Sequence, residues 1–333
     1  MIFRLSKTEY LSVKGNLITF LMYKKSFEPF GKISKKIWNI RIKFIELYVK
    51  FFHRKKITSV TNNSCIVKLK KNAYYSNKSF KFVLNKTDCY VLIEISKEKY
   101  DLAYCNIAEF ESGINIIDMY DLSPKIYEKY AILNKFYIKY EFINGKRAVC
   151  AKFDSSTLDA LINLNNTNTI YISLIQYVKK FNIDNYLYQL LVDYIDKKSI
   201  YNVKLSIGVT HGDFAPYNIF YKADRIKIID WNDCVVGEFI YYDAIYYHVA
   251  VCSELQSEDT EILFERIKSD TFKLSKMLNI PSDCVVVILI IDLYSLHNKI
   301  CLKYPNDSVT LCAFKLLSFV VSNIHTILDD CSC

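Results

Sequence analysis

The order of hydrophobic and polar positions divides the chain into a first part rich in short strands and a second part rich in helices. In the first part, three β-rich apolar runs are separated by polar breaks, and two more follow a helical stretch. The expected strands are 65–69, 80–84, 90–95, 126–130 and 136–142, and the expected helix is 100–117. The last strand runs into Asn144-Gly145, a dipeptide typical of turns.

The second part has a mostly helical pattern from Ser155 onward, interrupted by a strand pair between Val209 and Asp230. Strands followed by helices predict a two-lobed α+β protein. We expect an N-terminal extension at 1–58, a smaller, mainly β lobe at 59–146 and a larger helical lobe at 147–333, with a functional loop at 209–231.

Composition narrows the class of protein. Hydrophobic residues make up 51% of the 333 positions and charged residues 24%, as in a globular chain. No uncharged apolar window is long enough to span a bilayer, and no secretory signal is recognisable at the N-terminus, so we expect a cytoplasmic protein. The 11 cysteines include no C-x-x-C pair. This argues against a zinc ribbon and favours free thiols in a reducing compartment.

Charge is unevenly distributed. Residues 1–80 carry 18 Lys and Arg and 3 acidic residues, a net +15, whereas the rest of the chain is at −6. Much of the positive charge lies in an expected helix at 34–54, which also carries Trp38, Phe44 and Phe52. Such a helix could lie on an anionic membrane at the inner face of the cell, or pack onto the body of the protein with its charges in water. Nucleic acid is a weaker third option, because no nucleic-acid-binding motif accompanies the charge.

The functional loop combines residue types suited to phosphoryl transfer. Asp213 and Asn218 lie five residues apart in the turn-rich run His-Gly-Asp-Phe-Ala-Pro-Tyr-Asn, and Asp230 ends a short apolar strand twelve residues later. Phosphoryl transfer needs a carboxylate to orient the attacking hydroxyl and metal ions to bridge the phosphate oxygens. Carboxylate and amide oxygens are suitable ligands for Mg²⁺. An Asx-rich turn joining two strands is the structural alternative.

This run, followed by Ile-Asp-Trp at 229–231, resembles the aminoglycoside phosphotransferase and choline kinase group, which includes bacterial lipopolysaccharide and sugar kinases. Gly237-Glu238 and Tyr242-Asp243-Ala244 resemble two further elements of that group, although a proline is missing. The stretch Tyr-Glu-Phe-Ile-Asn-Gly-Lys at 140–146 resembles the hinge between kinase lobes. The resemblance covers roughly residues 80–250 and implies a two-lobed protein-kinase-like fold.

The resemblance also implies roles for individual residues. Asp213 would be the catalytic base, with His211 bracing the loop and Asp243 supporting the C-lobe. Asn218 and Asp230 would hold Mg²⁺. The nucleotide, ATP, would be bound by Lys97, Glu109, Tyr140 and Phe142, with Glu111 as the alternative helix glutamate.

One departure keeps two functions open. Glu94 stands where such kinases carry a phosphate-binding lysine, so Lys97, Lys99 or Lys81 would have to supply that charge. The first function is an ATP-dependent phosphotransferase acting on a hydroxyl of a small molecule or glycan, such as a lipopolysaccharide sugar. The alternative is a pseudokinase that serves as a nucleotide-binding or scaffolding module. The sequence does not identify the acceptor.

Overall fold

The architecture was obtained from a computed structural model. It describes residues 2–4, 9–15, 21, 36, 38–45, 65–71, 79–84, 89–95, 122–132, 135–148, 153–166, 170–222, 225–255 and 259–330. Contacts divide the chain into two units, each considered separately below. The first comprises 1–113, 120–150 and 217–229, and the second 114–119, 151–216 and 230–333.

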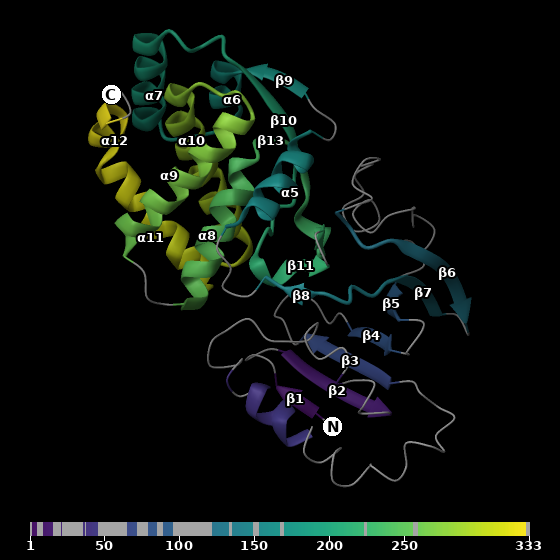
Figure 1. The fold of residues 1–333 in the computed structure, drawn as a ribbon. Coiled ribbons are helices and arrows are strands. Elements are labelled where there is room, and N and C mark those ends of the chain that lie inside the picture. The colour runs from purple at the N-terminus through teal and green to yellow at the C-terminus, as the bar shows by residue number, and fades with distance from the viewer. Residues whose placement is uncertain are drawn as a thin grey trace. The chain divides into compact units, whose positions relative to one another are not determined.

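The first unit is built on an antiparallel sheet of seven strands in the order β1-β2-β3-β4-β5-β7-β6. These are β1 (Ile2–Arg4), β2 (Glu9–Gly15), β3 (Cys65–Lys71), β4 (Ser79–Leu84), β5 (Tyr90–Ile95), β6 (Ile126–Ile132) and β7 (Lys135–Glu141) (Figure 1). A second sheet, β12-β11-β8, joins β8 (Lys146–Arg147), β11 (Ile219–Lys222) and β12 (Arg225–Ile228).

The strands predicted at 65–69, 80–84, 90–95, 126–130 and 136–142 are confirmed as β3 to β7, with small changes at their ends. The stretch predicted as an N-terminal extension contributes β1 and β2, and β2 pairs along its whole length with β3. The expected helix at 100–117 lies outside the described residues. The domain limits 1–58, 59–146 and 147–333 remain predictions.

Of the predicted basic helix at 34–54, the structure describes a helical stretch at 38–45. Its apolar residues lie on two faces. Trp38, Ile42 and Ile45 are each 4% exposed, whereas Ile40 is 49% and Phe44 68% exposed. Trp38 therefore belongs to the core of the first unit.

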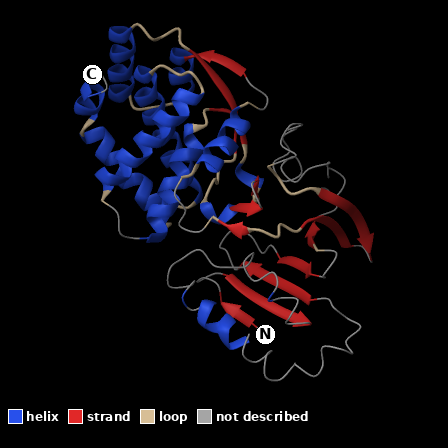
Figure 2. Ribbon diagram, in the orientation of Figure 1, coloured by secondary structure: helices blue, strands red, loops and turns tan. Residues whose placement is uncertain are grey.

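The second unit is mainly helical (Figure 2). Its helices are α5 (Ser155–Asn165), α6 (Leu174–Lys180), α7 (Asn185–Lys198), α8 (Tyr241–Leu255), α9 (Thr260–Met277), α10 (Ser282–Lys303), α11 (Ser308–Ser322) and α12 (Ile324–Asp330). A three-stranded sheet, β13-β10-β9, contains β9 (Ile170–Ser173), β10 (Lys204–Thr210) and β13 (Val235–Glu238). The predicted α+β class, with a smaller, mainly β part and a larger helical part, is confirmed.

Local sequence explains where these helices begin. Asp154, Asp184, Asp259 and Asp307 are N-caps whose carboxylates accept backbone N–H groups of the first turn, and Ser173 forms a capping box with Gln176. Helix α10 is buried on all sides from Cys284 to Leu293, and this stretch is apolar except for Asp292. Its 18-residue window of mean hydropathy 1.8 is long enough to cross a membrane but is 67% buried inside the protein.

The cysteines that the structure describes carry free thiols, as predicted: Cys89, Cys234, Cys252, Cys284, Cys301 and Cys312. Burial raises the pKa of the Cys284 thiol to about 12, so this thiol stays protonated and inert.

Candidate active site

The predicted catalytic loop begins where the central strand of the second unit ends. Strand β10 pairs with β9 along its first half and with β13 along its second half. The chain then leaves the sheet at His211. Asp213 is partly exposed, whereas its neighbours Gly212 and Phe214 are buried. A rigid, buried strand thus presents one accessible carboxylate.

The loop backbone is held by Asp243, in the first turn of α8. Its Oδ2 accepts the His211 N–H at 2.6 Å, and its Oδ1 accepts the Gly212 N–H at 2.9 Å. Asp243 is 0% exposed, and this burial raises the pKa of its carboxyl to about 7, whereas the two backbone hydrogen bonds act to lower it. Asp243 therefore orients the residues that precede Asp213.

The His211 ring fits the predicted bracing role. The ring is fully buried, and its Nδ1 accepts the Asp213 N–H at 3.3 Å. Because Nδ1 accepts this hydrogen bond, a neutral ring carries its proton on Nε2. The ring also packs edge-on against Trp231, with the centroids 4.6 Å apart.

Gly212 brings the catalytic loop against the loop that follows Asp230. It has φ +79°, and an added Cβ would lie 2.0 Å from the backbone oxygen of Asp233. Only glycine allows both this backbone conformation and this approach. The residue directly before Asp213 and a residue three positions after Asp230 are thereby in contact within the second unit.

Asp230 itself has an unusual backbone. Its φ and ψ of 67° and 62° are left-handed, and its Oδ1 accepts the Asn232 side-chain amide at 2.6 Å. Non-glycine residues in this region are uncommon, cost free energy and concentrate at functional sites. The conformation turns the chain sharply directly after β12.

Asn218 lies in the first unit, at the start of β11. Its carbonyl accepts the Ile229 N–H at 2.9 Å, and Ile219 pairs with Ile228. Asn218 is therefore hydrogen-bonded to the residue directly before Asp230. The Asn218 amide oxygen and the Asp230 carboxylate are both hard donors of the kind that suits Mg²⁺. Among the described residues, no three His, Cys, Asp or Glu side chains cluster as a metal site.

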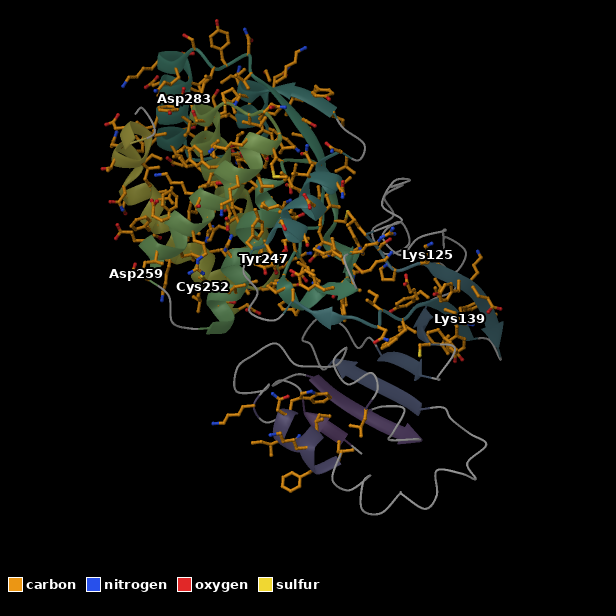
Figure 3. All side chains as sticks on the ribbon, in the orientation of Figure 1. Lys125, Lys139, Tyr247, Cys252, Asp259 and Asp283 are labelled. Carbon is orange, nitrogen blue, oxygen red and sulfur yellow. The ribbon has the colours of Figure 1, made fainter. Side chains whose placement is uncertain are left out.

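The predicted hinge is anchored by a buried ion pair in the first unit. Lys227 of β12 lies 3.9 Å from the Glu141 carboxylate and donates to the Ser123 carbonyl at 3.1 Å. The Glu141 N–H donates to the carbonyl of Lys125, which Figure 3 labels, at 2.7 Å. Tyr140 and Phe142, predicted to contact the nucleotide, flank Glu141 and are 8% and 7% exposed.

The remaining nucleotide-binding predictions are not placed. Lys97 and Glu109, and their alternatives Lys99 and Glu111, lie outside the described residues. In the sheet, Lys81 of β4 pairs with Leu92 of β5. Glu94 pairs with Tyr137 of β7. The lysine that would contact the phosphates stays a prediction.

Residues 187–271 match the phosphotransferase enzyme family. The resemblance predicted from the sequence is confirmed over this segment, which includes Asp213, Asn218, Asp230 and Asp243. No curated protein has significant sequence similarity to the chain.

Several solved structures are loosely similar. An amicoumacin kinase, hAmiN, solved with AMP-PNP and Ca²⁺, is 12% identical over 86% of this chain and 96% of that chain, with a TM-score of 0.41. Aminoglycoside phosphotransferase APH(4)-Ia is 11% identical over 83% of this chain and 99% of that chain, with a TM-score of 0.41. Choline kinase LicA from Streptococcus pneumoniae is 13% identical over 81% of this chain and 99% of that chain, with a TM-score of 0.36.

Sequence reasoning missed two buried charged residues, Lys227 in the first unit and Asp292 in the second. Lys227 sits in the apolar strand Arg-Ile-Lys-Ile, and Asp292 sits within the apolar run of α10. Each is a single charged residue in an otherwise apolar element. This pattern could have indicated a buried ion pair or hydrogen bond, because a buried charged group needs a partner.

Proposed function

We propose that this chain is an ATP-dependent phosphotransferase that moves the γ-phosphate to a hydroxyl of a small-molecule or glycan acceptor. One observation carries the proposal. The loops bearing Asp213 and Asp230 are packed together through Gly212 against Asp233, and the residue before Asp230 is hydrogen-bonded to Asn218. A base and two metal-binding side chains are the set that this reaction needs.

In this mechanism the Asp213 carboxylate orients the acceptor hydroxyl and takes its proton. The hydroxyl oxygen forms a bond to the γ-phosphorus while the bond from that phosphorus to the β–γ bridging oxygen breaks, and ADP leaves. Asn218 and Asp230 would hold Mg²⁺, which neutralises charge on the phosphate oxygens. Tyr140 and Phe142 would contact the adenine. Lys97 would bind the phosphates and pair with Glu109.

For the acceptor, we favour a neutral glycan sugar such as one of lipopolysaccharide. A cleft of about 240 Å³ lies in the second unit beside Lys299, which pairs with Glu238. Its lining combines amide, hydroxyl and ammonium groups with aromatic and apolar ones: Phe181, Asn182, Tyr294, Ser295, Asn298, Lys299 and Leu302. These groups suit sugar hydroxyls and ring faces, whereas a polycationic antibiotic calls for carboxylates.

The activity is tested by ADP release from Mg-ATP with sugars, glycolipids, amino alcohols and aminoglycosides as acceptors. We expect release that depends on a sugar or glycolipid and on Mg²⁺.

The second candidate function, a nucleotide-binding scaffold, is favoured by Glu94 on β5, where a lysine was expected. Nucleotide binding without ADP release on any acceptor would support the scaffold and contradict the enzyme.

We further propose that the helix at 38–45 binds an anionic membrane at the cytoplasmic face. Its exposed side carries the apolar Ile40 and Phe44 beside the charged Arg41 and Lys43, and Lys36, just before this stretch, is also exposed. Apolar side chains that enter the interface and basic residues near anionic lipid both stabilise such binding.

This contact is tested by sedimentation with anionic and neutral vesicles. Phe44→Ser should weaken binding to anionic vesicles by about thirtyfold, because burying such a side chain contributes about 2 kcal/mol. Phe314→Ser is the matched control, since Phe314 is 55% exposed on α11. Absence of wild-type binding at low salt, or an equal loss in both variants, would contradict the proposal.

A further inference from the structure

The segment Gly237–Asp243 joins β13 to α8 and is fastened at several points along its length. Lys180 of α6 donates to the Gly237 carbonyl, and Lys299 of α10 donates to the Glu238 carboxylate. The other Glu238 oxygen accepts the Thr210 hydroxyl at 3.4 Å. The segment ends at Asp243, whose carboxylate holds the two backbone N–H groups before Asp213.

At the centre of this segment, one hydroxyl connects three elements. The Tyr177 Oη of α6 accepts the Phe239 N–H at 3.1 Å and donates to Asp292 Oδ1 of α10. The Tyr177–Asp292 pair thus holds the chain at Phe239, four residues before Asp243.

Because Tyr177 and Asp292 are buried, their polar groups depend on hydrogen-bond partners inside the protein. Tyr177 is 0% and Asp292 1% exposed, and the tyrosine ring lies edge-on to Phe181 at 5.1 Å and to Phe239 at 6.4 Å. A buried N–H and a buried carboxyl each require a partner. Burial raises the pKa of Asp292, which favours a neutral carboxyl at this position.

We propose that Tyr177 is a positioning residue: its hydroxyl, held by Asp292, fixes the segment through which Asp243 orients the catalytic loop. This inference deepens the proposed phosphotransferase function and rests on it for its kinetic consequence. The Tyr177 hydroxyl acts on the position of Asp213 and not on the substrates. It should therefore affect turnover and leave substrate binding unchanged.

The test is Tyr177→Phe, which removes the hydroxyl and keeps the buried ring. We expect kcat for ADP release to fall by about tenfold, the size of effect expected when one buried hydrogen bond that positions the catalytic loop is lost. The KM values for ATP and acceptor should stay within about twofold. Tyr194→Phe is the matched control, because the Tyr194 hydroxyl donates to Asp283 of α10 at 3.5 Å, away from this segment (Figure 3 labels Asp283).

A second readout does not depend on activity. Amide hydrogen exchange of the peptide containing His211 and Gly212 should be faster in Tyr177→Phe than in wild type and unchanged in Tyr194→Phe. If the wild-type protein releases no ADP, the phosphotransferase proposal fails while exchange still tests the positioning of the loop. If Tyr177→Phe does not fold, Tyr177→Phe with Asp292→Leu is measured in the same way, because removing both buried partners is better tolerated.

Wild-type exchange at residues 211–212 in a folded Tyr177→Phe protein would overturn the inference. So would a loss of kcat without a change in exchange, since the effect would then not pass through the loop. Faster exchange confined to this loop, together with a selective loss of kcat, is the expected result.

Discussion

At the scale of single residues, backbone conformation at two positions decides the geometry of the candidate site. Gly212 and Asp230 have φ of +79° and +67°. The first allows the catalytic loop to approach the backbone of Asp233, and the second turns the chain directly after β12. Glycine adopts a positive φ without steric cost, whereas the left-handed conformation of Asp230 costs free energy, so surrounding contacts must maintain it.

Gly212→Ala should destabilise the protein by at least about 2 kcal/mol, because it combines a left-handed alanine with a clash against a backbone atom. Gly237→Ala is the control. Gly237 also has a positive φ, +91°, but its added Cβ would meet only the Lys180 Nζ at 3.4 Å. Urea unfolding of both variants measures the difference. Equal losses of stability would show that the contact with Asp233 carries no cost.

Asp243 makes a prediction about pH. The pKa of its carboxyl is raised from 3.8 to about 7, mainly by burial, so the folded state binds this proton more tightly than the unfolded state does. Its contribution to stability is complete below about pH 3.8 and is lost as the pH rises through about 7.

The free energy of unfolding of wild type relative to Asp243→Asn should therefore fall between about pH 4 and pH 7, by at most about 1.4 kcal/mol per pH unit. Urea unfolding of both proteins across this range measures it. Parallel curves would contradict the raised pKa.

The predicted catalytic and metal-binding residues could be named from the sequence because their order and spacing are specific. Asp213, Asn218 and Asp230 required no knowledge of the fold. By contrast, the hydrogen bonds that Asp243 accepts from the loop join positions about 30 residues apart, and Tyr177 and Asp292 are 115 apart. Partners this distant are brought together by tertiary packing, which local pattern does not encode.

At the scale of elements, apolar β-rich runs were the best guide. Strand β5 has the predicted limits, Tyr90–Ile95. The strands β1, β2, β8, β9 and β13 were missed. Four of these have only two to four residues, too few to establish alternation. Strand β2 is longer, but its Glu-Tyr-Leu-Ser-Val-Lys-Gly sequence mixes polar and apolar positions, and its pairing with β3 decides the outcome.

The prediction at this scale concerns the ion pair between Lys227 of β12 and Glu141 of β7. Lys227→Met leaves Glu141 buried without its cation, which should cost about 3–5 kcal/mol of stability. Affinity for AMP-PNP should fall by about tenfold, because Tyr140 and Phe142 adjoin the carboxylate that is released. Thermal unfolding and calorimetry measure the two effects.

Two variants control this experiment. Adding Glu141→Leu to Lys227→Met should restore part of the stability, since no buried charge then remains. Lys125→Met should change neither quantity, because Lys125 is exposed and contacts Glu141 through its backbone. Unchanged nucleotide affinity in Lys227→Met would contradict a role of this pair at the hinge.

At the scale of the whole molecule, charge and chemistry are segregated along the chain. The first 80 residues hold a net charge of +15, and the predicted catalytic and metal-binding residues all lie between 211 and 230. Surface attachment and phosphoryl transfer are therefore proposed for different stretches of the chain. A loss of vesicle binding in Phe44→Ser should leave ADP release on a soluble acceptor unchanged.

The most direct test of the central claim compares ADP release by wild type and Asp213→Asn with Mg-ATP and a sugar or glycolipid acceptor. The substitution keeps the size of the side chain and removes its capacity as a base. We predict acceptor-dependent release by wild type, reduced by about 10²–10⁴-fold in the variant, with AMP-PNP binding and thermal stability retained. Equal rates in the two proteins would contradict the assignment of Asp213 as the catalytic base.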